Sequence, residues 1–411
     1  CQSQVDASKE EISKMSDIVT EAIESGALGF STSRAILHRD VHGVYVPGTE
    51  ASSEEMKSLA FAIDKAGEGT LEIVSDWLDK EIEMSWMREY VEKSNCGLTV
   101  LQTSGDAVKT ILFCEEQFLK GKNVRPQFPG RNVGMMCCLE SSLHPFSGHP
   151  SYREIADLPL SERVQFILGD PPNYEPGKED SIAALAKSKG IAELEVIYDE
   201  FLKNEGTNLV YACFTPYDNH KLDFVERAYS LKSSVAGGSD GGAHCGLICD
   251  ASMPTTNLSH WARDREAGKK IPIELIVRKQ TKDTAETYGL FDRGEIKTGM
   301  LADLNIIDFE KLNVTHPKMV YDLPLGGRRL IQTSSGYLAT VKSGEVVYEA
   351  GEATGVLPGK LIRGKQTCEV KTEKERVPFI DRTHRLMSVK AFKLLLNLRN
   401  SSVKTTVVSD D

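Results

Sequence analysis

The sequence predicts an α/β fold in which parallel strands alternate with helices, followed by a smaller antiparallel β unit. Two observations support this fold class. Between residues 8 and 128, a helical pattern is followed by a strand-like run four times in succession. From Ile296 onward, short β-type runs are instead separated by glycine-containing turns. A chain of 411 residues is long enough for one large α/β unit and a small second domain.

The expected helices carry apolar residues at helical spacing, as Ile12, Met15 and Val19 do in the first of them. These helices cover residues 8–25, 53–66, 78–93, 106–120, 191–203, 219–231 and 273–288. Pro272 precedes the last helix and Gly289 follows it, which is typical of a helix start and a helix end.

Six runs are strand candidates in the first part, at 26–33, 70–75, 98–103, 123–128, 209–214 and 234–238. One of the six could be accessory, and helices between them predict parallel pairing. Residues 130–208 interrupt the rhythm with turn signals, so an insertion is expected there. Later β runs at 303–308, 329–332, 337–342 and 345–347 predict antiparallel pairing, with a hairpin at Lys342-Ser343-Gly344-Glu345.

Composition and charge exclude several function classes. Lys and Arg number 49 and Asp and Glu number 60, a net charge of −11, which argues against nucleic acid as the main partner. Apolar runs stay short of the roughly 20 residues that a membrane span needs. The nine scattered cysteines indicate reduced, buried thiols, and we expect a cytoplasmic protein. The chain starts with Cys1, shows no leader, and is expected to begin partway through a longer protein.

Residues 365–411 form a basic C-terminal extension. They carry ten Lys and Arg against six Asp and Glu, a net charge of +4. Within the extension, residues 388–400 have the pattern of a basic amphipathic helix. Two interpretations stay open: a helix that contacts a membrane surface or partner, and a solvated helix docked on its own domain.

The loop after strand 234–238 carries the main catalytic candidate, in the run Gly238-Ser239-Asp240-Gly241. In parallel α/β folds, reactive groups collect where strands end, and glycines let a ligand come close to the backbone. A carboxylate at Asp240 can bind a divalent metal and take a proton from bound water. An aspartate that caps a helix or closes a turn is the alternative.

The motifs taken together resemble the amidohydrolase superfamily. The stretch Gly294–Leu304 looks like the return of that family's chain into its small β-sandwich, and Gly26–Thr32 resembles the fourth barrel strand of the N-acyl-D-amino-acid deacylase (D-aminoacylase) branch. The stretch Tyr337–Gly364 also fits that branch, and the whole resemblance covers roughly residues 8–364. It implies a partial (β/α)8 TIM-type barrel, about strands 4–8, in residues 1–295, with the insertion at about 130–208, and a small antiparallel β-sandwich portion at 296–364.

The resemblance implies a metal-dependent hydrolase of C–N amide bonds that acts on small N-acyl amino acids, of D configuration. One or two zinc ions would polarise the acyl carbonyl and activate water, and Asp240 would serve as general base and then as general acid. The family's His-x-His pair is missing, because the match begins at the fourth strand. The ends of the runs at 70–75 and 98–103, which would be the fifth and sixth barrel strands, lack histidine. At the first end, Asp76 could bind a metal through oxygen. At the second end, Gln102 would be a poor zinc ligand. We therefore expect the isolated chain to have little or no activity.

The remaining candidates each have a functional and a structural interpretation. His144 and His149 come after the strand candidate at 123–128, which would be the seventh strand of a full barrel. Each is either a metal ligand or a hydrogen-bonded loop histidine. His244 is either a metal ligand or a substrate contact. Arg34 and Arg131 lie at strand exits, where each could clamp a substrate carboxylate or form a structural ion pair.

Two other functions compete with linear amide hydrolysis. A hydantoinase-like hydrolase of cyclic amides uses a carboxylated lysine to bridge two metals in that family branch, and no lysine stands at the tip of strand 26–33. A non-catalytic or truncated relative is favoured by the missing ligands. The sequence leaves the oligomeric state open, including a homo-oligomer.

Overall fold

The computed structural model describes residues 6–36, 38, 44–102, 108–139, 141, 144–146, 173–203, 208–215, 221–239 and 246–367. Four of the predicted features lie outside these residues: Asp240, His149, His244 and the helix expected at 388–400. No described helix is long and apolar enough to cross a membrane.

Four helix–strand units build the first half of the described chain. They comprise α1 (Lys9–Glu24), β1 (Gly29–Arg34), α2 (Ser53–Ala66), β2 (Thr70–Ser75), α3 (Lys80–Lys93), β3 (Gly97–Leu101), α4 (Val108–Leu119) and β4 (Val124–Pro129). Local sequence signals set the helix starts: the Ser8 hydroxyl accepts from the Glu11 amide, and the Glu11 carboxylate accepts from the Ser8 amide. The expected alternation of helix and strand is confirmed over this part.

The strands form one parallel sheet in the order β1-β2-β3-β4-β7, where β7 spans Val235–Gly237. The strands stand in the order in which they occur along the chain, so the sheet has no reversal of strand order, although β5 and β6 intervene between β4 and β7 in the sequence. The mixed α/β class with a parallel sheet is therefore confirmed. In the described pairing, β1 and β7 are the two edges, and closure into a barrel stays a prediction.

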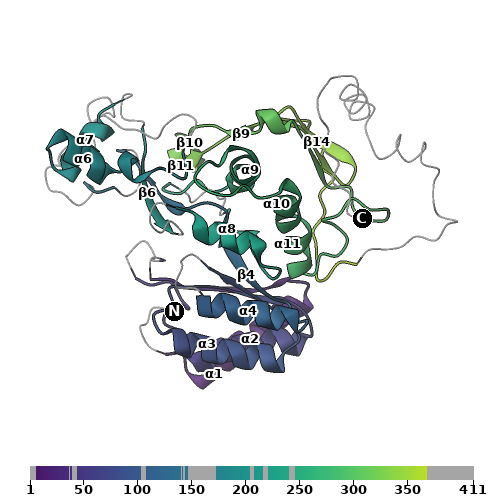
Figure 1. The fold of residues 1–411 in the computed structure, drawn as a ribbon. Helices are drawn as coiled ribbons and strands as arrows, with labels where there is room; N and C mark the ends of the chain where they lie inside the picture. The colour runs from purple at the N-terminus through teal and green to yellow at the C-terminus, as the bar shows by residue number, and fades with distance from the viewer. Residues whose placement is uncertain are drawn as a thin grey trace, which may run out of the picture.

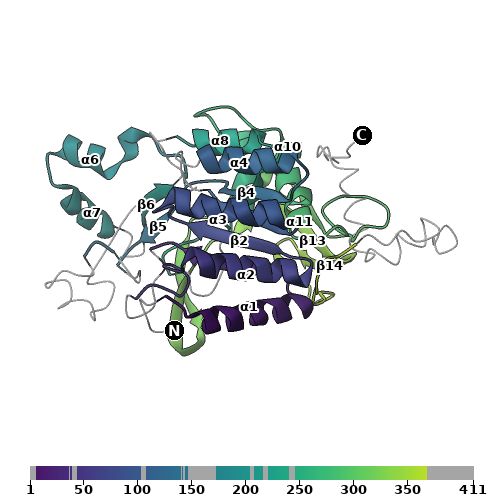
Figure 2. The same cartoon turned by 90° about the horizontal axis from the view of Figure 1, so that it is seen from below.

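Helices α1 to α4 cover one face of this sheet (Figures 1 and 2). Their apolar residues pack with Leu71, Ile73 and Leu98 from the strands in the largest buried cluster. Because side chains alternate along a strand, the residues between these point to the other face. That face is polar: the Gln127 side-chain amide donates to Glu72 at 2.9 Å and lies 3.4 Å from the Tyr288 hydroxyl.

A separate two-stranded sheet pairs β5 (Val133–Cys137) with β6 (Val210–Thr215) in antiparallel fashion. The expectation that 209–214 continues the parallel sheet is therefore wrong. A short apolar run specifies a strand but not its partner, and residues 133–137 supply one. The 3-10 turn Lys178–Asp180 and helices α6 (Ile182–Lys189) and α7 (Glu193–Phe201) lie in the stretch between β5 and β6, and Figure 1 draws α6 and α7 apart from α1–α4.

The helices of the second half are α8 (Asp223–Ser230), α9 (Met253–Thr256), the π-helix Asn257–Asp264, α10 (Ile273–Gln280) and α11 (Lys282–Thr287). The single helix expected over 273–288 is thus broken in two. Thr281 leaves the helical region with φ −117° and ψ −84°, and the Thr284 hydroxyl donates to the Lys279 carbonyl at 2.7 Å. No apolar residue stands between Val277 and Ala285, so the apolar spacing is interrupted where the helix breaks, and the expectation of a single helix over 273–288 is wrong.

The C-terminal part contains antiparallel strands, as expected. The four-stranded sheet β15-β14-β13-β8 joins Glu352–Ala353, Glu345–Glu349, Tyr337–Lys342 and Leu304–Ile307. The smaller pairs join β9 (Asn313–Val314) to β12 (Ser334–Ser335) and β10 (Lys318–Leu323) to β11 (Gly327–Ile331). The predicted hairpin between β13 and β14 is confirmed, with positive φ angles of 52° at Ser343 and 86° at Gly344 that fit a two-residue hairpin turn.

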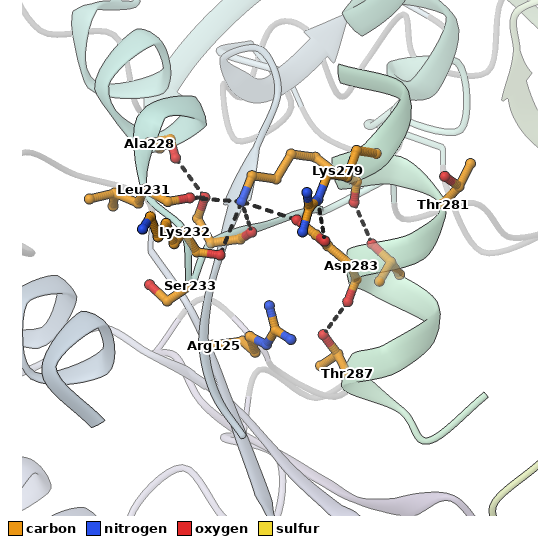
Figure 3. A network of polar contacts seen from close by, with 12 residues as sticks. Arg125, Ala228, Leu231, Lys232, Ser233, Lys279, Thr281, Asp283 and Thr287 are labelled. Carbon is orange, nitrogen blue, oxygen red and sulfur yellow. Dashed lines mark hydrogen bonds and ion pairs between the residues drawn. The ribbon is translucent and has the colours of Figure 1, made fainter. Parts of the chain in front are cut away.

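A buried ammonium group ties α10 to the loop between α8 and β7. The Lys279 Nζ donates to the carbonyls of Leu231 at 2.7 Å and Ser234 at 2.6 Å, and lies 3.3 Å from Asp283 Oδ2 (Figure 3). The Lys279 side chain is only 2% exposed. One charge thus satisfies several carbonyls that the apolar surroundings would otherwise leave unpaired.

We expect Lys279→Met to lower the free energy of unfolding by about 3–5 kcal/mol, since it leaves the loop carbonyls and Asp283 Oδ2 buried without the ammonium, while Asp283 Oδ1 keeps its contact with Arg278. The measurement is urea unfolding followed by circular dichroism. The matched control is Lys109→Met, whose ammonium pairs with Glu81 at 2.9 Å but is 69% exposed, and a loss below ~1 kcal/mol is expected there. Equal losses in the two variants would show that the Lys279 contacts contribute no more than a surface pair.

Candidate active site

The carboxyl ends of the five parallel strands meet at one edge of the sheet, and the predicted site belongs there. Gly238 follows β7 with φ 77°, in the left-handed region that favours glycine. A Cβ atom at this position would also lie 3.4 Å from Pro129 Cβ at the end of β4. The chain therefore turns sharply beside β4 just before Asp240, whose own position lies outside the described residues.

Arg34 lies at the end of β1, where its guanidinium is engaged within the protein. Its Nε donates to Glu83 of α3 at 2.6 Å, and its Nη1 donates to the carbonyls of Gly48 at 3.0 Å and Ala51 at 2.9 Å. The side chain is 11% exposed. These contacts join β1, α3 and the segment before α2, and we infer that the structural alternative for Arg34 is the better one.

Asp76 follows β2 at the neighbouring strand end. Its Oδ2 accepts from the backbone amide of Ile36 at 2.7 Å, and its own amide donates to the Arg34 carbonyl at 3.4 Å. The carboxylate thus holds together the chain segments that leave β1 and β2. Asp76 is exposed, so the remaining lone pairs of its carboxylate can face solvent or a ligand.

Arg131 follows β4 and is fully buried, with 0% exposure. Its Nη2 donates to Asp250 Oδ1 at 3.0 Å and to the Cys249 carbonyl at 2.7 Å, and its Nη1 donates to Thr256 at 3.2 Å. The Tyr174 ring lies 3.8 Å from Cζ. Burial works to lower the pKa of Arg131, but nearby Tyr174 and Asp250 outweigh it, and the pKa is raised. A cation enclosed in this way does not reach a substrate, so we infer a structural ion pair here as well.

His144 lies in an apolar setting beyond β5. It is 6% exposed, its ring lies perpendicular to that of Phe201 at 5.7 Å, and its Nδ1 accepts from the Phe146 amide at 3.3 Å. Its neighbours differ from those of Asp76, which stands at the edge of the large sheet. The described part of the chain therefore does not assemble these two candidate ligands into one site, and it holds no group of three or more His, Cys, Asp or Glu side chains suited to a metal ion.

Two buried amide side chains at the carboxyl edge have atoms without a hydrogen-bond partner among the described residues. Gln102, directly after β3, is 1% exposed, and both of its amide atoms lack such a partner. The Oδ1 atom of Asn257 lacks one as well. Asn257 lies against Gly130 so closely that a Cβ there would be 1.7 Å from its Oδ1. Buried amides are normally satisfied. Neither amide is a good zinc ligand. The described residues at this edge therefore do not fit a zinc centre.

Sequence reasoning missed a buried ionic group around Glu175. The Glu175 carboxylate accepts from His260 Nε2 at 2.9 Å, from Arg265 Nε at 3.1 Å and Nη2 at 3.2 Å, and from the Leu222 amide at 3.1 Å. Burial would raise the pKa of Glu175, but these donors outweigh it and lower the pKa to about 2. These partners lie 47–90 residues from Glu175 along the chain, so no short sequence motif indicates the cluster.

The stability that Glu175 provides should depend on pH. Its pKa is lowered from 4.5 to about 2 in the folded state, so the contribution is complete above pH 4.5 and is lost as the pH falls toward 2. We expect Glu175→Gln to cost about 3 kcal/mol at pH 7, with the difference from wild type shrinking between pH 4.5 and 2. Urea unfolding at pH 7, 4 and 3 checks this. A difference that is independent of pH would contradict the ionic role.

Several cysteines are buried thiols with raised pKa values. Burial raises the pKa of Cys137 and Cys213 to about 11 and that of Cys114 to about 12. These three thiols are therefore protonated near neutral pH. The expectation of buried cysteine is confirmed for Cys114 and Cys137, whereas Cys213 is half-buried; the reduced state stays a prediction.

Comparison with known proteins points in the direction of the sequence resemblance. Residues 174–348 match the model of the amidohydrolase family, a segment that contains β6, β7, α10 and α11. This match supports the amidohydrolase superfamily and a hydrolase that acts on C–N bonds. Among solved structures, L-hydantoinase (dihydropyrimidinase) from Arthrobacter aurescens superposes with a TM-score of 0.38 and 13% identity, over 88% of this chain and 72% of that one. No curated protein matches the chain.

Proposed function

We propose that this chain takes part in the hydrolysis of linear C–N amide bonds in N-acyl amino acids of D configuration. In this proposal, Asp240 is the residue that transfers the proton. The observation that carries the proposal is the Gly238-Ser239-Asp240-Gly241 run at the exit of β7. This run lies inside the stretch that matches the amidohydrolase family. It also follows a strand of the parallel sheet, at the edge where such folds collect reactive groups.

The proposed reaction is a hydrolysis in which Asp240 moves one proton. The carboxylate takes a proton from the attacking water, whose oxygen adds to the acyl carbon. The bond between the acyl carbon and the nitrogen then breaks, and the same carboxyl group gives its proton to the leaving nitrogen. The products are the free acid of the acyl group and the free amino acid. Zinc stays an expectation from the sequence resemblance alone: of its candidate ligands, Asp76 and His144 are not brought together in the described chain, and Asp240 and His149 lie outside the described residues.

Recognition of the substrate carboxylate falls to His244 in this proposal. In the other two candidates, Arg34 Nε and Nη1 and Arg131 Nη1 and Nη2 donate to protein groups, and Arg131 Nε, which lacks a partner among the described residues, is buried. His244 is four residues beyond Asp240 in the same glycine-containing loop. Its imidazole could bind a carboxylate as a hydrogen-bond donor.

The test is release of free amine from a substrate panel by the protein expressed from its own gene, with the isolated 411-residue chain as a second sample. The panel holds N-acetyl-D-amino acids and their L isomers. Hydantoin, the cyclic alternative, is followed separately by chromatography of its ring-opened N-carbamoyl product, because opening of this ring releases no free amine. We expect turnover of the D isomers, with much lower activity in the isolated chain. Absence of turnover together with less than ~0.1 equivalent of bound zinc would favour the non-catalytic alternative.

A further inference from the structure

A cavity of about 470 Å³ lies at the other edge of the parallel sheet, where the strands begin. Thr70 and Gly97, the first residues of β2 and β3, line it together with Arg125 of β4 and the end of α11. Its walls include Phe118, Asn123, Arg125 and Thr287. It is thus distinct from the carboxyl edge, where Asp240 follows β7.

Arg125 is the buried cation of this cavity. It is 7% exposed, its Cζ lies 4.4 Å from the centre of the Phe118 ring, and its Nε donates to Asn123 Oδ1 at 3.3 Å. Within the described chain, its two Nη atoms make no hydrogen bond. Figure 3 draws Arg125 beside Asp283 and Thr287, with no dashed line that ends on it. A guanidinium has five donors in a planar fork, so most of its hydrogen-bonding capacity is left for a ligand.

The neighbouring carboxylates are engaged by other cations. Asp283 Oδ1 accepts from Arg278 Nε at 3.1 Å, and its Oδ2 lies 3.3 Å from Lys279 Nζ. Glu286 Oε1 lies 3.8 Å from Lys282 Nζ. Asp283 and Glu286 act on Arg125 only through the field they set up, without direct contact. A buried charge without a contact partner is costly, and an anion in the cavity would remove this cost.

One backbone acceptor in the wall of the cavity is already occupied by other donors. The Thr287 carbonyl, at the end of α11, accepts from Thr70 Oγ1 at 3.0 Å and from Asn123 Nδ2 at 2.9 Å. That acceptor is therefore already satisfied by two other donors. The same bonds fix Asn123, which in turn orients the Arg125 Nε.

We propose that this cavity binds a small anionic ligand, through a carboxylate or phosphate group held by the Arg125 guanidinium. Both groups present a pair of oxygens that match the fork of the guanidinium. The Phe118 ring holds the guanidinium plane from one side. The proposal is independent of the hydrolytic function, because none of the residues that carry it lies at the carboxyl edge.

Isothermal titration calorimetry of the full chain tests this proposal, with sodium phosphate and sodium succinate in separate titrations at constant ionic strength. We expect saturable one-site binding of at least one probe, and the probe that binds tells phosphate from carboxylate. Arg125→Gln should weaken binding at least ~10-fold. Lys365→Gln is the matched control, because this cation also lines the cavity but its Nζ lies over the Phe291 ring at 5.1 Å; a change below ~2-fold is expected. Equal affinity in Arg125→Gln, or no saturable binding of either probe, would overturn the proposal.

A measurement on the wild-type chain covers the case in which Arg125→Gln does not fold. Phenylglyoxal modifies accessible arginines, and peptide mass spectrometry gives the extent at each site. The probe that binds should protect Arg125 at least ~5-fold and leave Arg329 unprotected, since Arg329 pairs with Asp322 on the surface. Equal protection at the two arginines, or none at Arg125, would contradict the site.

Discussion

Replacing Asp240 by Asn is expected to lower kcat for release of free amine from N-acetyl-D-amino acids at least ~100-fold. The amide has nearly the same size as the carboxylate but cannot take a proton from water. Because proton transfer belongs to the reaction step, kcat should fall more than KM changes. Steady-state kinetics on the protein expressed from its own gene measures both constants.

The matched control for this variant is Asp17→Asn on α1. Asp17 pairs with Lys65 at 3.2 Å and is 69% exposed, so the same chemical change on the surface should leave kcat within ~2-fold. Zinc content is measured for both proteins. A kcat for Asp240→Asn close to that of wild type would assign proton transfer to another residue.

A stability effect as large as that of Lys279→Met is expected for Asp250→Ala, which should lower the free energy of unfolding by about 3–5 kcal/mol. The substitution removes the carboxylate that accepts from Arg131 Nη2 at 3.0 Å. The guanidinium would then stay in a site with 0% exposure without a counter-charge. Urea unfolding of wild type and variant at neutral pH measures the loss.

Asp322→Ala provides the comparison, because it breaks an equally short arginine pair at the surface. Arg329 donates to the two Asp322 oxygens at 2.8 and 2.7 Å, while the two side chains are 36% and 48% exposed. A loss below ~1 kcal/mol is expected there. Losses of similar size in the two variants would mean that the Arg131 pair gains little from its burial.

Much of the parallel sheet could be predicted from local patterns. The helix expected at 53–66 and the strand expected at 70–75 have the bounds observed for α2 and β2. The local signals agree there, because Ser52 caps the helix start and Gly67 adopts a left-handed conformation at its end. Where capping, apolar spacing and turn residues all coincide, the sequence determines the element.

Pairing between distant segments could not be predicted in the same way. The run at 209–214 has the composition of a strand, but its partner β5 is an equally short run about 75 residues earlier. The break between α10 and α11 falls in a stretch without apolar residues, where the Thr284 hydroxyl donates to the Lys279 carbonyl. Such features come from tertiary contacts, which apolar periodicity does not encode.

The same limit applies to the candidate site: the sequence gives the type of each residue but not its partner in the fold. Position at a strand end made Arg34 and Arg131 candidates for substrate binding. Their partners, Glu83 and Asp250, lie 49 and 119 residues away along the chain, and neither was anticipated. Whether an arginine at a strand end binds substrate or forms a structural ion pair depends on whether the fold places a carboxylate beside it. The local sequence does not show this.

The account rests on a carboxylate at position 240 that moves a proton at the carboxyl edge of the sheet. Chemical rescue tests this most directly: Asp240→Ala is assayed for amine release from an N-acetyl-D-amino acid with increasing sodium formate. We predict that the variant is nearly inactive and that formate, as a substitute carboxylate, restores turnover in a saturable way while wild type is unaffected. Full activity of Asp240→Ala without formate would contradict the account.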